Sequence, residues 1–184
     1  YGPDGSTTGF HVFQVLESDG GSGVNVAKFD SNTRISLSNN DSGTSNTIFG
    51  KSAGASLDAG SNYNTFIGEA VSDASMNDAL YNTGVGYQAL SALTTGDANT
   101  AIGMNTGAAI VGGAGNTLLG QGAGSTTTAV NYTTIVGADA ALADMTTGAN
   151  GTVAIGYTAL TALTSGPYNT AIGYNACKTY TTKG

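Results

Sequence analysis

The chain has 184 residues, and only 9% of them are charged, against about 25% in ordinary globular domains. It contains 29 Gly, no Trp and one Cys, and its net charge is −7. A single Cys excludes an internal disulfide and a zinc site made of several Cys, and the absence of any apolar run of about 18 residues excludes a spanning helix. The sequence begins at Tyr1 without Met, so we expect a processed product or part of a longer protein.

The acidic charge is concentrated in one part of the chain. No Lys or Arg lies between Lys51 and Lys178. The acidic residues of this stretch are Asp58, Glu69, Asp73, Asp78, Asp97, Asp139 and Asp144. Without cations to neutralise phosphates, we expect no nucleic-acid partner and no membrane insertion. Weak acidity otherwise serves solubility.

The first part of the chain, residues 1–45, is predicted to form short β-strands. We expect them at 10–16, 24–29 and 34–38, separated by turns at 17–23 and 30–32. Terminal units of repeat proteins often differ from the units they adjoin. We therefore interpret 1–45 as a capping or connecting β segment, followed by a repeat domain over 46–184.

A five-residue phrase, Asn-Thr-x-aliphatic-Gly, occurs eight times in the repeat domain. In chain order it reads NTIFG, NTFIG, NTGVG, NTAIG, NTLLG, TTIVG, TVAIG and NTAIG. The phrases close with Gly50, Gly68, Gly86, Gly103, Gly120, Gly137, Gly156 and Gly173, so they recur every 17 to 19 residues. A unit this short cannot bury its own apolar side, but stacked units can. The sequence therefore predicts an all-β fold, a parallel β-solenoid (β-roll or β-helix) of about eight rungs.

Alternation along the strand then divides each phrase between two faces. The residue before the closing Gly is always large and apolar, and we predict that these residues form the core of the repeats. They are Phe49, Ile67, Val85, Ile102, Leu119, Val136, Ile155 and Ile172. The Thr of the phrase, two residues earlier, shares this predicted inner face.

The opposite face of the strand also lacks charge, which is unusual for a face that meets water. We predict that it forms a subunit interface along the rod, with the phrase Asn alongside. The predicted interface residues are Ile48, Phe66, Ala101, Leu118, Ile135, Ala154 and Ala171, with Gly84 at the same position. A threefold axis is the simplest arrangement that buries one such face per chain. The alternative is a monomeric solenoid covered by a second layer of the same chain.

The repeats resemble two groups of extracellular proteins. The phrase NTAIGYNA at 169–176 and its variants GYQAL from Gly86 and GYTAL from Gly156 are similar to the repetitive shafts of bacteriophage tail fibres and to the head repeats of trimeric autotransporter adhesins. The stretch FDSNTRISLSNN at 29–40 looks like the lead-in to such arrays. The resemblance covers residues 24–184. It implies parallel β-rolls in homotrimers, on a virion surface or outside the cell.

The sequence offers no constellation that favours an enzyme. His11 is the only His, and it lies on a predicted strand, so a catalytic triad is not favoured. Cys177 occupies the place of Leu90 and Leu160 in other repeats and is interpreted as a small core residue. Pairs of carboxylates such as Asp73 with Asp78 lie at different offsets in their repeats, unlike the paired acids of glycosidases. We predict no catalytic, cofactor-binding or metal-binding residues.

Two functional classes remain open. The first is a structural fibre module, tail-fibre-like or adhesin-like, whose copies form a stiff rod for surface attachment, either as a homotrimer or as an end-to-end filament. A host-surface glycan or protein would then be a further partner. The alternative is an ice-binding β-solenoid, because regular Thr arrays on a flat face can match ice. The predicted placement of Thr inside, beside the large aliphatics, argues against that alternative.

Tyrosines flank the phrase on both sides and have two interpretations. Those before it are Tyr63, Tyr81, Tyr132 and Tyr168, and those after it are Tyr87, Tyr157 and Tyr174. Exposed Tyr suits recognition surfaces, including those for sugars. The other interpretation is packing between neighbouring rungs.

Overall fold

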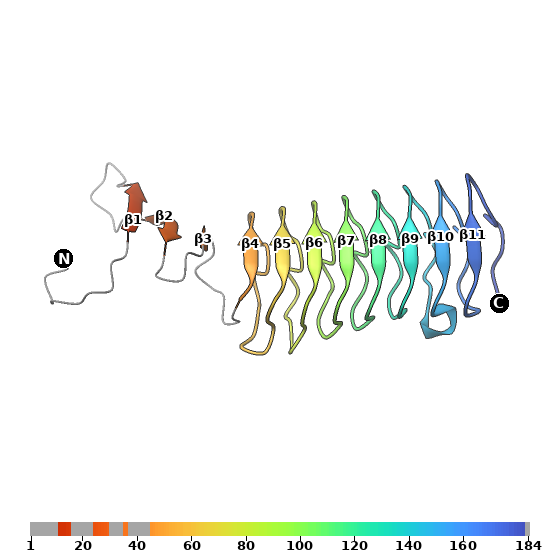
Figure 1. Cartoon of the computed structure of the whole chain (residues 1–184), viewed down its shortest axis with the longest axis horizontal. Helices are drawn as coiled ribbons and strands as arrows, with labels where there is room; N and C mark the ends of the chain where they lie inside the picture. The colour runs from red at the N-terminus through yellow and green to blue at the C-terminus, as the bar shows by residue number, and fades with distance from the viewer. Residues whose placement is uncertain (1–10, 16–23, 30–34, 37–44, 183–184) are drawn as a thin grey trace, which may run out of the picture. The chain divides into compact units, whose positions relative to one another are not determined.

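The computed structural model of the chain describes residues 11–15, 24–29, 35–36 and 45–182 (Figure 1). The chain divides into two compact units, residues 1–39 and residues 40–184, which are described separately. The turns predicted at 17–23 and 30–32 lie outside the described residues.

The first unit contains an antiparallel sheet in the order β1-β2-β3. Its strands are β1 (His11–Val15), β2 (Val24–Phe29) and β3 (Ile35–Ser36). β1 and β2 pair from His11 opposite Phe29 to Val15 opposite Val24, with a register shift between Phe13 and Gln14. The three strands lie within the ranges predicted from the sequence.

The second unit is a parallel sheet of eight strands that follow one another in chain order (Figure 1). Each strand coincides with one copy of the phrase, which confirms the repeat. The strands are β4 (Thr47–Phe49), β5 (Thr65–Ile67), β6 (Thr83–Val85), β7 (Thr100–Ile102), β8 (Thr117–Leu119), β9 (Thr134–Val136), β10 (Val153–Ile155) and β11 (Thr170–Ile172). One 3-10 helix, η1 (Thr147–Ala149), interrupts the loop before β10.

The rungs lie directly over one another in register. Ile102 pairs with Leu119, and Leu119 pairs with Val136. Backbone hydrogen bonds between rungs continue outside the strands, for example from the Gly107 N–H to the Ala123 carbonyl at 3.0 Å. The predicted fold class is therefore confirmed: the repeat domain is an all-β parallel solenoid of short rungs.

The closing position of the phrase requires Gly for steric reasons. Gly103 has a φ of 135°, a conformation that residues with a side chain rarely adopt, and a Cβ built on it would lie 2.7 Å from the carbonyl group of Gly120 in the next rung. The same close approach to the next closing Gly recurs at Gly86 and Gly120. The chain can therefore turn out of the strand and keep its rung spacing only where the residue is Gly.

The faces of the strands are the reverse of those predicted. The predicted interface residues lie inside the coil: Ile48, Phe66, Ala101, Leu118, Ile135, Ala154 and Ala171 are all at most 6% exposed. The predicted core residues point outward instead. Among them Phe49, Ile67, Ile102, Leu119 and Ile172 are 38% to 67% exposed, and Val85, Val136 and Ile155 are partly exposed. The phrase Thr residues share this outer face, so the predicted inward Thr ladder is also wrong.

One reason is the limited volume inside the coil. Large side chains reach the interior from the segment after the closing Gly, including the buried Leu93, Ile110 and Leu163. The inward-pointing middle residue of each strand must then fit the space that these side chains leave. A Cβ at Gly84 would lie 2.6 Å from Val71 Cγ1, so this rung accepts no side chain at all in the middle of its strand. The prediction placed the largest residues inside without counting the volume supplied by the rest of the rung.

Candidate interaction surface

A ladder of buried asparagines fixes which face of most strands points inward. The amide nitrogen of Asn99 donates to the Gly113 carbonyl across the coil at 2.7 Å. Its Oδ1 accepts from the backbone N–H of Asn116 at 3.1 Å and from the Asn116 amide at 2.9 Å. Asn82 and Asn116 repeat the pattern with the Gly96 and Val130 carbonyls. Each side chain therefore bridges its own coil and also binds the next rung.

Because side chains alternate along a strand, the inward position of Asn also determines the faces of the other phrase residues. The Asn and the middle residue of the strand lie two positions apart, so they share the inner face, and the Thr and the residue before the Gly share the outer one. Sequence reasoning missed this role of Asn. The available signal was a polar side chain at one fixed position in most copies, because a recurring buried amide can pair with its own copy in the next rung.

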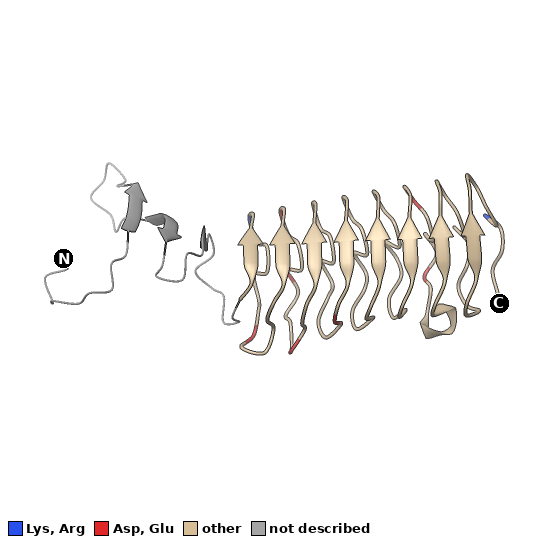
Figure 2. Ribbon diagram, in the orientation of Figure 1, with Lys and Arg blue, Asp and Glu red and all other residues tan. Residues whose placement is uncertain are grey.

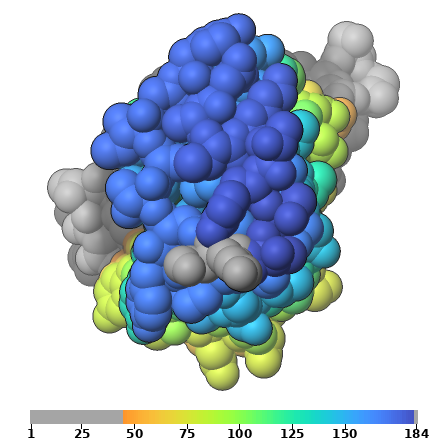
Figure 3. Space-filling model, turned by 90° about the vertical axis from the view of Figure 1, so that its right-hand side faces the viewer, coloured from red at the N-terminus to blue at the C-terminus, as the bar shows by residue number. Residues whose placement is uncertain are grey.

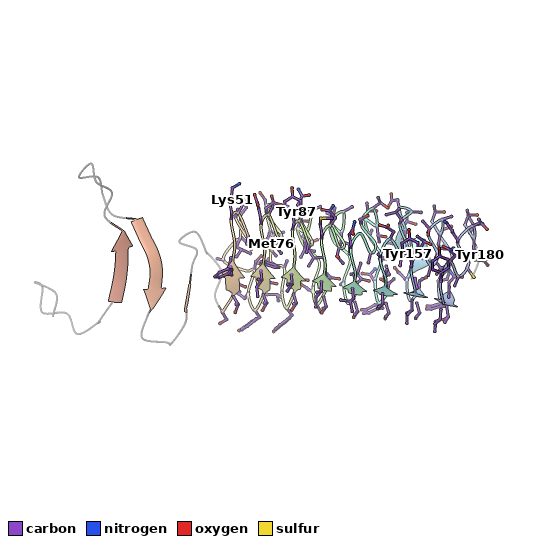
Figure 4. All side chains as sticks on the ribbon, turned by 90° about the horizontal axis from the view of Figure 1, so that it is seen from above. Lys51, Met76, Tyr87, Tyr157 and Tyr180 are labelled. Atoms are coloured by element: carbon purple, nitrogen blue, oxygen red, sulfur yellow. The ribbon has the colours of Figure 1, made fainter. Side chains whose placement is uncertain are left out.

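The outer face of the sheet carries two straight columns of side chains. The aliphatic column consists of the eight residues before the closing glycines, from Phe49 to Ile172. The threonine column consists of the first residue of each strand: Thr47, Thr65, Thr83, Thr100, Thr117, Thr134, Val153 and Thr170. In Figure 4 the strands are seen from above, with side chains extending from them both into the coil and away from it. The strands contribute no charged residue to this face.

Charge is sparse in the whole described solenoid, as Figure 2 shows. Lys51 and Glu69, directly after the closing glycines of the first two rungs, form an exposed ion pair at 2.9 Å. The hydrogen bond to Glu69 raises the pKa of Lys51 above its usual value. Elsewhere single acidic residues accept hydrogen bonds within loops, as Asp144 does from Thr128 at 2.9 Å. The outer face is therefore apolar and hydroxylated, with its charge confined to the surrounding loops.

The tyrosines form two further columns beside the strands. Tyr63 and Tyr81 stack with ring centroids 5.1 Å apart and planes 7° apart. Tyr157 and Tyr174 stack at 5.5 Å and 19° on the other side of the strands. The interpretation of rung-to-rung packing is thus confirmed for these two pairs, and all four rings remain 48% to 75% exposed.

Cys177 differs from its counterparts in other rungs. Leu90 and Leu160 are buried at 0% and 1% exposure, whereas Cys177 is exposed. It belongs to the rung of β11, and no further described rung covers that rung. Figure 3 looks onto this end of the molecule. The interpretation of Cys177 as a core residue is therefore wrong for the described chain, because burial at this position needs a neighbouring rung.

Within residues 45–182 and the described strands of the first unit, no group of three or more His, Cys, Asp or Glu is arranged to hold a metal ion. The same residues contain no helix with the length and apolar character needed to cross a bilayer. The fold and surface define the class of protein, a parallel β-solenoid with an exposed Thr and aliphatic face. No protein-family model, curated protein or solved structure matches the chain.

Proposed function

We propose that the chain is a structural fibre module of an extracellular or virion-surface appendage, and that its copies associate through the outer face of the sheet into a homotrimer. The observation that carries the proposal is the aliphatic column. Eight apolar residues point away from the coil in one straight line, and five of them are at least 38% exposed. Side chains of this kind are stabilised when a partner removes them from water.

The extent of this face supports association. Seven intervals of about 4.8 Å between neighbouring strands, and a strand length of about 10 Å for three residues, give the two columns a footprint of roughly 340 Å². That footprint is already comparable with the largest apolar patch of a typical monomer, about 300 to 600 Å². A second copy offers a surface of the same chemistry and the same length.

The in-register stacking favours a parallel cyclic arrangement. If the rods lie parallel around one axis, each aliphatic residue meets its own copies at the same height, so Ile102 packs on Ile102 of each partner. Every layer then closes on itself and leaves no apolar surface for further growth sideways. The rod would be stiff along its length because backbone hydrogen bonds join each described rung to the next. These properties suit a spacer that holds an attachment site away from a surface.

The test is the molecular mass of the purified chain by light scattering across a range of concentrations. The proposal predicts three times the chain mass of 18.1 kDa. The double variant Ile102→Asp, Leu119→Asp places charges in the middle of the column and is expected to give the mass of one chain with unchanged β content. The matched control is Gln121→Asp, which adds a charge directly after a closing Gly, outside the strand.

A monomeric wild-type chain at all concentrations would contradict the proposed assembly. A very large mass that persists in the double variant would instead indicate end-to-end growth through the backbone groups of the terminal rungs. A trimer that survives both substitutions would place the interface on another face.

A second candidate function, ice binding, gains one specific observation. The threonine column points outward in seven of the eight strands, beside the aliphatic column, on a sheet whose neighbouring strands pair in register. The objection that Thr lies inside the coil therefore does not hold. Regular hydroxyl and methyl groups on a flat face are the features that a lattice of ordered water can match.

Thermal hysteresis distinguishes the two candidates, because they use the same face in incompatible ways. An ice-binding chain must leave the threonine column open, so it should be monomeric, show hysteresis and lose it in Thr100→Tyr. A fibre module should show no hysteresis at any concentration and should be trimeric. A trimer with no hysteresis rejects ice binding, and a hysteretic monomer rejects the fibre proposal.

A further inference from the structure

The tyrosine column before the strands has an unusual backbone conformation. Its positions are Ser45, Tyr63, Tyr81, Ala98, Gly115, Tyr132, Gly151 and Tyr168, and all eight have φ between 54° and 69°. This left-handed region is disfavoured for residues with a side chain, and Gly or Asn usually occupies it. Two rungs do use Gly here, whereas four use Tyr. The left-handed conformation recurs at other non-Gly positions of the coil, such as Gln88 and Leu90, so what distinguishes this column is its exposed aromatic rings.

In the second half of the solenoid, each ring of this column lies over a glycine. A Cβ at Gly115 would lie 2.7 Å from Tyr132 Cδ1, and a Cβ at Gly151 would lie 2.8 Å from Tyr168 Cδ1. The glycines thus leave space for the rings against the backbone of the preceding rung. Tyr132 and Tyr168 are nevertheless 76% and 81% exposed, more than the stacked Tyr63 and Tyr81 at 54% and 59%. They form two supported aromatic platforms that face water.

Fixed amide groups lie beside these platforms. Asn131 directly precedes Tyr132, and its Oδ1 accepts from the Ala114 N–H at 2.9 Å. Asn150 directly precedes Gly151, and its Oδ1 accepts from the Asn131 N–H at 2.8 Å. These bonds orient both side chains, and within residues 45–182 their amide nitrogens donate to no other group. Each platform region therefore has an oriented hydrogen-bond donor with no protein acceptor.

The charge and spacing of this surface limit the ligand. The turns before β9, β10 and β11 carry no Lys or Arg, so an anionic polymer would find no cation within these turns. Tyr132 and Tyr168 belong to rungs two apart, a separation of about 9.6 Å. That is close to the repeat of a disaccharide in an extended polysaccharide. Aromatic faces stack on the C–H faces of sugar rings, while amides donate to sugar hydroxyls.

We propose that Tyr132 and Tyr168, with the amides of Asn131 and Asn150, form a binding surface for an uncharged, extended polysaccharide. The sugar chain runs along the rod and stacks one ring on each platform. The proposal adds a ligand site to the solenoid and does not depend on the chain being a trimer, because it requires only the turns before β9, β10 and β11.

The experiment measures retention of the full chain on microcrystalline cellulose, on chitin and on an insoluble mannan, with soluble alginate as the anionic comparison. We expect saturable binding to at least one of the three neutral polymers and none to alginate. Tyr132→Ala and Tyr168→Ala should each weaken that binding about fivefold, as the loss of one aromatic stack does. Asn131→Asp keeps the acceptor for the Ala114 N–H but removes the donor, and should also weaken it about fivefold.

The control is Tyr180→Ala, which removes a ring that is 40% exposed and outside the column, and which should leave binding unchanged. Thermal unfolding of every variant checks that the solenoid is intact. Retention on none of the three neutral polymers overturns the proposal, as does equal binding of the wild type and an intact Tyr132→Ala, Tyr168→Ala double variant. Binding to alginate in preference to the neutral polymers also overturns it. Light scattering on the same samples reports assembly separately.

Discussion

The first five rungs of the solenoid and the two that follow differ at the position before the strand. The first five have Asn there, and Asn64, Asn82, Asn99 and Asn116 are fully or almost fully buried. The next two have Thr133 and Thr152. The Thr133 hydroxyl still donates to Asn116 Oδ1 at 2.8 Å, but the buried Thr152 hydroxyl has no partner among the described residues.

Rung length changes at the same place. The closing glycines are 17 or 18 residues apart in the Asn rungs and 19 apart between Gly137 and Gly156, where η1 enlarges the loop. An Asn amide spans the coil to a loop carbonyl and so fixes the distance between strand and loop. Thr is too short to reach that carbonyl, and the loop is then free to lengthen. The rung that begins at Thr152 keeps the 17-residue spacing to Gly173, so loss of the Asn bond permits a longer loop without requiring one. The comparison teaches that the asparagine ladder ties the strand to the loop in most rungs.

Removing one rung of the ladder should have the largest effect. Asn99→Ala eliminates the bonds that the Asn99 amide donates to the Gly113 carbonyl and to Asn82 Oδ1, and it leaves the buried Asn116 N–H without its acceptor. We expect the free energy of unfolding to fall by about 4 kcal/mol. Urea titration followed by circular dichroism measures it. A loss below about 1 kcal/mol would show that the ladder does not stabilise the rungs.

Truncation on the two faces of one strand should sharpen the assignment of inside and outside. Leu118→Ala removes a fully buried side chain and should cost about 3 kcal/mol. Leu119→Ala acts on its neighbour, which is 44% exposed, and in the dissociated chain should cost less than about 1 kcal/mol. The same denaturant titration, at a concentration where the chain is monomeric, compares the pair. Equal losses would contradict the burial pattern.

Where Thr replaces Asn in the ladder, a substitution is expected to raise stability instead of lowering it. Thr152→Val keeps the shape of the side chain and removes a buried hydroxyl that has no partner in the described structure. It should therefore raise the free energy of unfolding by about 1 kcal/mol. Thr133→Val is the matched control, because its hydroxyl is bonded, and it should lower stability by a similar amount. Identical effects at both positions would contradict the comparison.

The smallest expected effect concerns pH. A hydrogen bond from Ser61 lowers the pKa of Asp58 below its ordinary value of 3.8. A carboxyl whose pKa is lower in the folded chain contributes stability above its unfolded pKa and loses that contribution as the pH falls through the folded value. The melting temperature of the wild type should exceed that of Asp58→Asn above about pH 4, and the difference should shrink below it. A constant difference down to pH 2 would contradict this role.

The sequence was enough to predict the parallel solenoid, its rung count and the strand positions, because the phrase recurs at nearly constant spacing. It was not enough to assign the faces. Phe49 and Ile102 are larger than Ala101 and Ala154, and residue size alone argues that the larger side chains fill the core. Residues such as Leu93 and Ile110 fill part of the interior from a different side of the coil. The volume left for the strand residues can therefore be judged only from the three-dimensional structure. The left-handed backbone conformation of the tyrosine column could not be predicted either, because Tyr is not typical of that conformation.

Cross-linking at two adjacent residues tests most directly the claim that the aliphatic column is both outward and covered by further copies. In a Cys177→Ser background, Leu119→Cys and Leu118→Cys are treated with a bis-maleimide that spans about 10 Å, the spacing of packed sheets. The account predicts that L119C links chain to chain through the same residue, while L118C in the native chain does not react. A reactive L118C, or an L119C that accepts a single maleimide but never joins two chains, would contradict it.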